Sequence, residues 1–87
     1  MPRVTLRLFA AAREAAGTGH DTFDGATVGD VLAAASARYG DEFRQVLASS
    51  RVWLDGDEPA DGDATPVTDD AELAVLPPVS GGAVDAG

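Results

Sequence analysis

Apolar and polar residues alternate along several short stretches of the chain, and this period of two is typical of half-buried strands. In the first stretch, Phe9 falls on the face opposite to Leu6 and Leu8. Turn-forming residues separate these stretches from the segments between them. The pattern predicts strands at residues 4–9, 20–23, 51–55 and 72–76.

A different period, close to that of a helix, runs through residues 28–39. Thr27 is suited to cap this segment with its hydroxyl, and the carboxylate of Asp30 lies where it faces the positive end of the helix dipole. Gly40 is suited to end the run. The sequence therefore predicts one main helix, with shorter helical segments at residues 10–16 and just after Gly40.

The stretch DGDEPADGDATPVTDD, residues 55–70, combines glycine, proline and aspartate, which is turn chemistry. It lacks the residue order and closing glutamate of a calcium loop, so no metal site is predicted. The order of elements predicts an α+β fold in which a mixed sheet wraps one main helix. The predicted core consists of Val4, Leu6, Leu8, Val31, Leu32, Val52, Leu54, Leu73 and Val75.

Fifteen acidic residues against six basic ones, all arginine, give the 87-residue chain a formal net charge of −9. This field repels phosphate backbones and anionic lipids, so no nucleic-acid or membrane partner is expected. It favours a partner with a basic docking surface, although solubility or a high-salt host explains the acidity equally well. Cysteine is absent, which excludes a disulfide framework and a cysteine nucleophile. No secretory signal or membrane span is recognisable, so a cytoplasmic location is expected.

Beyond Pro78 the apolar periodicity stops, which divides the chain into a folded domain, 1–78, and a flexible tail, 79–87. Gly81 and Gly82 have no Cβ, so this part of the tail could thread a slot too narrow for other residues. The alternative, a frayed terminus without function, is the commoner fate of glycine-rich ends.

Four stretches together resemble the MoaD/ThiS family of ubiquitin-like sulfur carriers: LFAAAREAAG, TVGDVL, TPVTDDAEL and LPPVSGG. The resemblance is closest to the small subunit of molybdopterin synthase and covers residues 3–82. It implies a β-grasp fold for residues 1–78, with the first and last strands parallel at the sheet centre. Asp70 departs from the glycine of many members, and members usually end at the second glycine, whereas this chain continues to Gly87.

The resemblance implies a carrier that has no catalytic residue and no permanently bound cofactor. An adenylating enzyme of the ubiquitin-activating type would use ATP to join the Gly82 carboxylate to AMP, and a sulfur donor would displace AMP to leave a thiocarboxylate. The large subunit of molybdopterin synthase, or another sulfur-accepting enzyme, would then take the sulfur. Besides the carrier end at Gly81 and Gly82, the expected partner-binding residues are Phe9, Leu76, Pro77, Pro78, Val79 and Ser80.

Residues 83–87 would block Gly82, so a maturation protease is expected to remove them. The competing interpretation is that Gly87 itself is the working end, although the stretch before it lacks the paired glycine. Three alternatives stay open at this point: a ubiquitin-like protein modifier, a sulfur carrier for cysteine, thiamine or a thio-acid metabolite, and a binding module that is never conjugated. Trp53 is left undecided, because a lone tryptophan on a small sheet more often belongs to the core.

Overall fold

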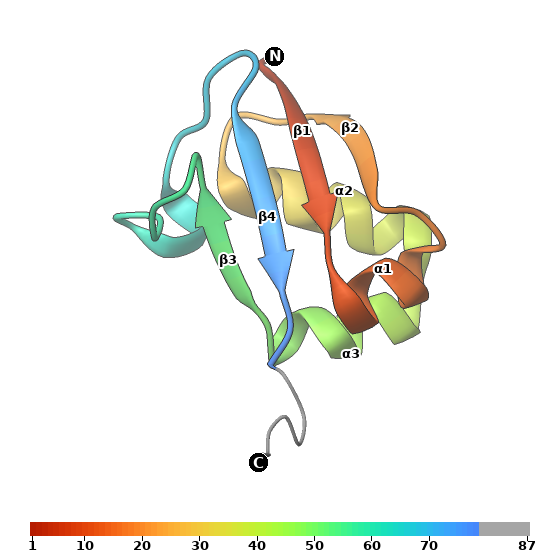
Figure 1. The fold of residues 1–87 in the computed structure, drawn as a ribbon. Coiled ribbons are helices and arrows are strands. Elements are labelled where there is room, and N and C mark those ends of the chain that lie inside the picture. The colour runs from red at the N-terminus through yellow and green to blue at the C-terminus, as the bar shows by residue number, and fades with distance from the viewer. Residues whose placement is uncertain (79–87) are drawn as a thin grey trace.

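The computed structural model describes residues 1–78. Within this range the predicted helices and strands are present, and their ends agree with the prediction to within one residue. The predictions on the tail residues 79–87 lie outside the described residues. The elements of Figure 1 are β1 (Arg3–Leu8), α1 (Ala10–Ala16), β2 (His20–Asp24), α2 (Val28–Tyr39), α3 (Asp41–Ala48), β3 (Arg51–Leu54), the 3-10 turn η1 (Gly62–Ala64) and β4 (Glu72–Leu76).

The four strands form one mixed sheet in the order β2-β1-β4-β3. β1 and β4 pair in parallel at the centre, while β2 and β3 pair antiparallel at the two edges. The parallel register sets Leu6 opposite Leu73 and Leu8 opposite Val75. The first and last strands of the domain therefore lie side by side and parallel at the centre of the sheet, as the family resemblance implies.

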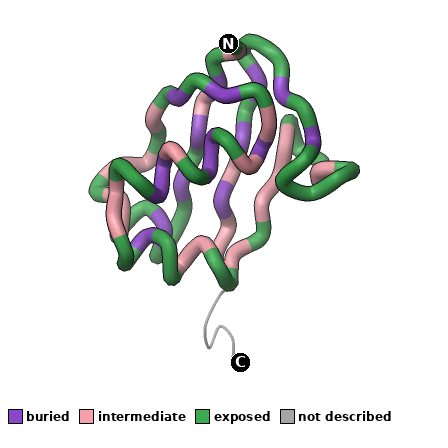
Figure 2. The backbone as a smooth tube through the Cα atoms, turned by 180° about the vertical axis from the view of Figure 1, so that it is seen from behind, coloured by how far each residue is buried: buried purple, intermediate pink, exposed green. Residues whose placement is uncertain are grey.

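α2 lies across one face of the sheet, and the buried positions gather between them (Figure 2). Of the predicted core residues, Val52 and Leu54 are only partly buried, although both pack against the core. They lie on β3, a short edge strand that has a neighbour on one side only. The buried apolar residues are Val4, Leu6, Leu8, Ala12, Phe23, Val28, Val31, Leu32, Ala35, Phe43, Val67, Ala71, Leu73 and Val75.

The start of α2 shows the capping that the sequence predicts, and a glycine ends α1. At the start of α2, the Thr27 hydroxyl accepts the N–H of Asp30 at 3.2 Å. The Asp30 carboxylate reaches back and accepts the N–H of Ala26, also at 3.2 Å. α1 ends at Gly17, whose φ of 78° lies in the left-handed region that glycine tolerates best.

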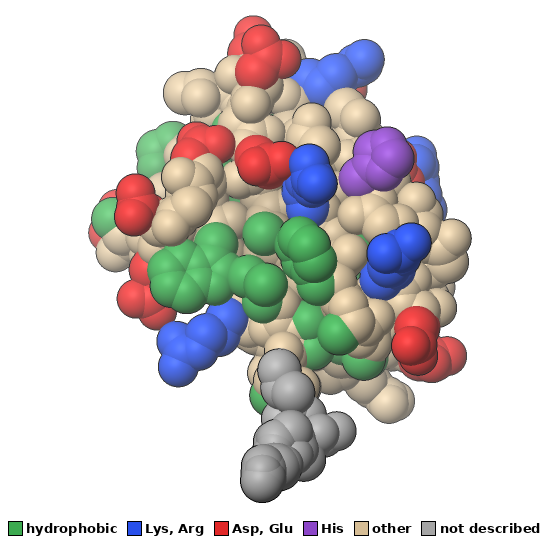
Figure 3. Space-filling model, viewed as in Figure 1, with side chains coloured by type: hydrophobic (Ala, Val, Ile, Leu, Met, Phe, Trp, Pro, Cys, Tyr) green, Lys and Arg blue, Asp and Glu red, His purple; other side chains and the backbone are tan. Residues whose placement is uncertain are grey.

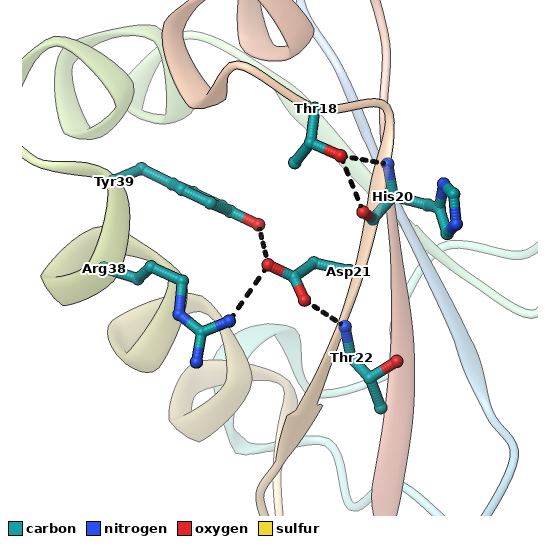
Figure 4. Close-up of polar contacts among 6 residues, drawn as sticks. All are labelled: Thr18, His20, Asp21, Thr22, Arg38 and Tyr39. Atoms are coloured by element: carbon teal, nitrogen blue, oxygen red, sulfur yellow. Dashed lines mark hydrogen bonds and ion pairs between the residues drawn. The ribbon is translucent and has the colours of Figure 1, made fainter.

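A polar cluster fastens the edge strand β2 to the end of α2 (Figure 4). The Asp21 carboxylate accepts the Tyr39 hydroxyl at 2.7 Å and the Arg38 guanidinium at 3.1 Å. The hydrogen bond from Tyr39 holds the pKa of Asp21 below its usual value. Burial and the neighbouring carboxylate raise the pKa of Tyr39, so this hydroxyl remains a donor at physiological pH.

The helices of residues 1–78 are too short and too polar to cross a membrane. The longest, α2, has 12 residues, whereas a span requires about 20. In the same part of the chain, His, Asp and Glu side chains do not gather in threes at a distance suited to a metal ion.

Candidate functional site

Within residues 1–78, the sheet face opposite α2 carries no helix (Figure 1). The register of the strands decides which side chains meet on it. Ala74 lies opposite Trp53, and Leu8 lies opposite Val75. The next residue after Leu8 is Phe9, whose N–H donates to the Val75 carbonyl at 3.3 Å. Phe9 therefore comes next to Leu76, on the same side of the sheet as Ala74 and Trp53.

We call these four residues, Phe9, Trp53, Ala74 and Leu76, the docking patch. Phe9 is 42% exposed, and apart from Met1 it is the one exposed large hydrophobic residue of the described chain. The other three members are partly exposed. Figure 3 shows hydrophobic side chains gathered over the part of the sheet from which the C-terminal segment leaves. A cluster of this kind on a small domain is typical of a protein-binding surface.

An abrupt turn between β1 and α1 determines the position of Phe9. Phe9 has an extended backbone, with φ −126° and ψ 153°, and the next residue, Ala10, has a φ of 51°. The Phe9 carbonyl accepts the N–H of Ala12 at 3.0 Å and that of Arg13 at 3.3 Å. The chain thus passes from strand to helix without a loop, and Phe9 keeps the outward direction set by the strand.

Neither Trp53 nor Ala74 is predicted from the sequence to lie on a binding surface. The signal for Trp53 is nevertheless present, because it alternates with Val52 and Leu54, which line the core side of β3. Nothing in the sequence marks Ala74 as part of a surface. Its place in the patch follows only from its register between Arg7 and Trp53.

Arginine side chains stand around the patch, which is notable in so acidic a chain (Figure 3). Arg51 lies opposite Leu76 in the register. Arg7 and Arg13, together with His20, line a cavity of about 390 Å³ beside Phe9. Arg7 donates to Glu72 at 3.1 Å. The border of the patch therefore contains basic side chains, of which Arg7 is paired with Glu72 and Arg51 lies near Glu58.

Pro77 and Pro78 continue from Leu76, the first partly buried and the second exposed. The remaining predicted site residues, Val79, Ser80, Gly81 and Gly82, lie outside the described residues. Of the predicted partner-binding residues, the structure thus brings together Phe9 and Leu76 at the base of the segment that leads to Gly82.

The model of the ThiS family matches residues 6–82 of the chain. The chain belongs to this family. The match includes the docking patch and extends to Gly82, five residues before the last residue of the sequence, Gly87. No curated protein sequence matches the chain closely enough to count as a relative.

Three solved structures illustrate the likeness. Small archaeal modifier protein 1 (SAMP1) from Methanosarcina acetivorans is 31% identical, with 93% of this chain and 97% of that chain covered and a TM-score of 0.84. The HVO 2177 protein of Haloferax volcanii is 34% identical, with 92% and 86% covered and a TM-score of 0.74. A chain in the complex of subunits 1 and 2 of molybdopterin-converting factor from Helicobacter pylori is 20% identical, with 91% and 97% covered and a TM-score of 0.66, which shows a shared fold.

These findings confirm the predicted family of ubiquitin-like sulfur carriers and the α+β, β-grasp fold. They do not distinguish between sulfur carriers of different pathways and protein modifiers, because both kinds of name occur among the similar proteins. The acceptor of the sulfur therefore stays a prediction.

Proposed function

We propose that this protein is a sulfur carrier whose working end is the carboxylate of Gly82. An adenylating enzyme joins this carboxylate to AMP from ATP, with release of pyrophosphate. Hydrosulfide supplied by a sulfur donor then attacks the acyl carbon, AMP leaves, and a thiocarboxylate remains. The observation that carries the proposal is the family match, which extends through both glycines to Gly82.

The docking patch suits a carrier that presents its end to other proteins. The chain from Leu76 to Gly82 spans at most roughly 20 Å when extended. A partner that holds the patch can therefore receive Gly82 in an active site about that far away. Phe9 and Leu76 anchor the contact, and residues 77–81 reach from it to the active site. The proposal needs two such partners, the adenylating enzyme and the sulfur acceptor.

For the acceptor, we propose the large subunit of a molybdopterin synthase. The resemblance to the small subunit of that enzyme supports this choice. A similar fold also occurs in the two-subunit complex of molybdopterin-converting factor from Helicobacter pylori. In this role the carrier supplies sulfur for the dithiolene of molybdopterin.

A second candidate is a protein modifier, in which Gly82 is transferred to lysine side chains of target proteins. It is favoured by the likeness to SAMP1, which is named as a modifier protein and is 31% identical over nearly the whole chain. Since this chain has no lysine, it cannot form polymers through its own side chains.

Residues 83–87 stand between Gly82 and the free carboxylate, and we propose that a protease removes them. The test compares the full chain with a chain that ends at Gly82. Each is incubated with a matching adenylating enzyme, ATP and a sulfur source, and intact mass is followed. We expect the chain ending at Gly82 to show the mass increase of one oxygen replaced by sulfur. Thiocarboxylate on Gly87 of the uncut chain would refute the proposed cleavage.

The same reaction separates the candidate functions. The activated chain is offered in parallel to a molybdopterin synthase large subunit with its precursor, and to lysine-containing proteins. Sulfur transfer to the first supports the carrier in molybdopterin synthesis, and amide conjugates with the second support the modifier. If no adenylate forms on Gly82 at all, both candidates fail and the chain is a binding module.

A further inference from the structure

The two edges of the sheet differ in how their outward backbone groups are bonded. On β2, the Thr18 hydroxyl donates to the His20 carbonyl at 2.9 Å, and the Asp21 carboxylate accepts the Thr22 N–H at 2.8 Å (Figure 4). Side chains thus occupy the outward groups of His20 and the outward N–H of Thr22, a partial cover of the kind that protects an edge against further strands. At the β3 edge, no side chain of residues 1–78 bonds to an outward backbone group.

The ladder between β3 and β4 shows which groups of β3 point outward. The Asp55 N–H donates to Glu72 on the β4 side at 2.8 Å, so alternate residues face away from β4. Leu54 is one of these. Its N–H donates to the Asp57 carbonyl at 2.7 Å, and its carbonyl accepts the Asp57 N–H at 3.0 Å. Val52 is the other, and no described residue bonds to its N–H or its carbonyl. One donor and one acceptor are therefore open at Val52.

A groove runs beside this open pair. It consists of two adjoining cavities, of about 430 and 350 Å³, which share Ser50, Val52 and Asp63. We call it the β3 groove. Leu32 and Leu47 line the first cavity, towards the helices. Glu58, Pro59 and Gly62 line the second. The segment that follows β3 folds back beside the strand (Figure 1), and its residues Glu58, Pro59 and Gly62 form the far wall of the groove.

The charge of the far wall is negative. Glu58 and Asp63 are the acidic residues of the groove, and both are exposed. Among the described residues that line the groove, Arg51 is the one basic residue. It approaches Glu58 only to 3.8 Å, with the two side chains 75% and 73% exposed. A pair so exposed is easily opened. The groove therefore favours a cationic occupant, in accord with the net charge of the chain.

We propose that the β3 groove binds a short, extended, basic peptide segment of a partner protein. The segment adds a strand to β3, with its backbone bonded to Val52, an apolar side chain near Leu32 and Leu47, and a basic side chain near Glu58 or Asp63. Strand addition to an open sheet edge is a general mode of peptide recognition. The docking patch lies on the other face of the sheet, so both surfaces can be occupied at once. The proposal does not depend on the chemistry at Gly82.

The test is a titration of the full, isotope-labelled chain with the peptide acetyl-KVRVK-amide, followed by amide NMR shifts. The acidic peptide acetyl-EVEVE-amide is the control for charge. We expect the basic peptide to shift residues 50–54 and 58–63, and the acidic peptide to leave them unchanged.

Two variants locate the binding. Val52→Pro removes the outward N–H without removing a bond to β4, and we expect at least a tenfold loss of affinity. Glu58→Gln with Asp63→Asn removes the negative wall, and we expect a loss of at least fivefold. Glu14→Gln with Glu42→Gln changes the net charge equally, away from the groove, and should alter affinity less than twofold. If Val52→Pro fails to fold, the comparison of the two double variants tests whether the peptide binds in the β3 groove.

Several results would overturn the proposal. They are an absence of shifts at millimolar peptide, equal shifts with the acidic peptide, shifts centred on Phe9 and Leu76, or equal losses in the two double variants. Analytical ultracentrifugation of the chain without peptide gives one further result that would overturn the proposal. A dimer that Val52→Pro dissociates would mean that a second copy occupies the groove. Thiocarboxylate formation at Gly82 is unaffected by any of these results, so the two proposals fail separately.

Discussion

Asp70 illustrates how a single residue meets a backbone demand. It lies in the turn before β4 with a φ of 67°, in the left-handed region that favours glycine and, after it, asparagine and aspartate. Its N–H donates to the Arg3 carbonyl at 2.9 Å, which ties the turn to the start of β1. Aspartate thus takes a glycine-like conformation at the position where the family resemblance leads one to expect glycine.

Replacing Asp70 by alanine should lower the free energy of unfolding by about 1 kcal/mol, because alanine has the left-handed strain without a polar side chain to offset it. Replacing it by glycine should change that free energy by less than about 0.5 kcal/mol, since relief of strain is offset by the greater entropy of the unfolded chain. Urea unfolding of the two variants measures both effects. Equal losses would contradict the role of the backbone angle.

Phe9 is the most exposed residue of the docking patch. Phe9→Asp should weaken binding to the adenylating enzyme and to the sulfur acceptor at least tenfold, because burying a phenylalanine contributes roughly 1.5–3 kcal/mol. The fold should persist, since Phe9 is 42% exposed and outside the core. Thr22→Asp, an exposed position on β2, is the control of equal charge. Unaltered affinity for both partners would exclude the docking patch.

At the scale of elements, the cluster of Asp21, Arg38 and Tyr39 joins β2 to α2. The pKa of Asp21 is lowered in the folded state, chiefly by the Tyr39 hydroxyl. A depressed pKa means that the contribution of Asp21 to stability is fully present above its unfolded pKa, about 4, and is lost as the pH falls through the folded pKa.

Tyr39→Phe should therefore lower the free energy of unfolding by about 1 kcal/mol at pH 7, the usual contribution of one hydrogen bond. Its difference from the unmodified chain should shrink as the pH falls below about 4, where Asp21 becomes protonated in the unfolded state. Denaturant unfolding at several pH values tests this, with Asp21→Asn as the matched variant. A difference that does not change with pH would contradict the assignment to Asp21.

The close contact between α2 and η1 predicts that alanine at position 29 destabilises the protein, although alanine is a better helix former than glycine. A Cβ on Gly29 would lie 3.0 Å from the Cβ of Asp63 and 3.1 Å from its carbonyl oxygen. Gly29→Ala should therefore lower the free energy of unfolding by about 1 kcal/mol, although alanine in a free helix is favoured by about that amount. The midpoint of thermal unfolding shows whether the variant is less or more stable than the unmodified chain. A higher midpoint would show that η1 moves aside without cost.

At the scale of the whole molecule, the sheet and the buried core lie within residues 1–78. A chain that ends at Pro78 should consequently unfold within about 2 °C of the full chain, a change well below that of 1 kcal/mol in a domain of this size. It should also lose all acceptance of AMP and sulfur. A clearly lower midpoint would show that residues 79–87 contribute to the stability of the domain.

Local patterns in the sequence determined the elements and most of the core. Alternation located β1, β3 and β4, helical spacing located α2, and the outward direction of Phe9 followed from its place in the alternation. These features depend on residues a few positions apart, so they are present in the sequence itself. Membership of the family likewise came from short stretches, and the match to residues 6–82 confirmed it.

Only the tertiary structure decided which of these elements meet. The docking patch requires Phe9, Trp53 and Leu76 to lie on the same face of the sheet, and this depends on pairing between strands from opposite ends of the domain. The same pairing leaves β3 at an edge, which explains why Val52 is only partly buried and why its outward backbone groups are open. No local pattern encodes a register, because register is set by how distant side chains pack against one another.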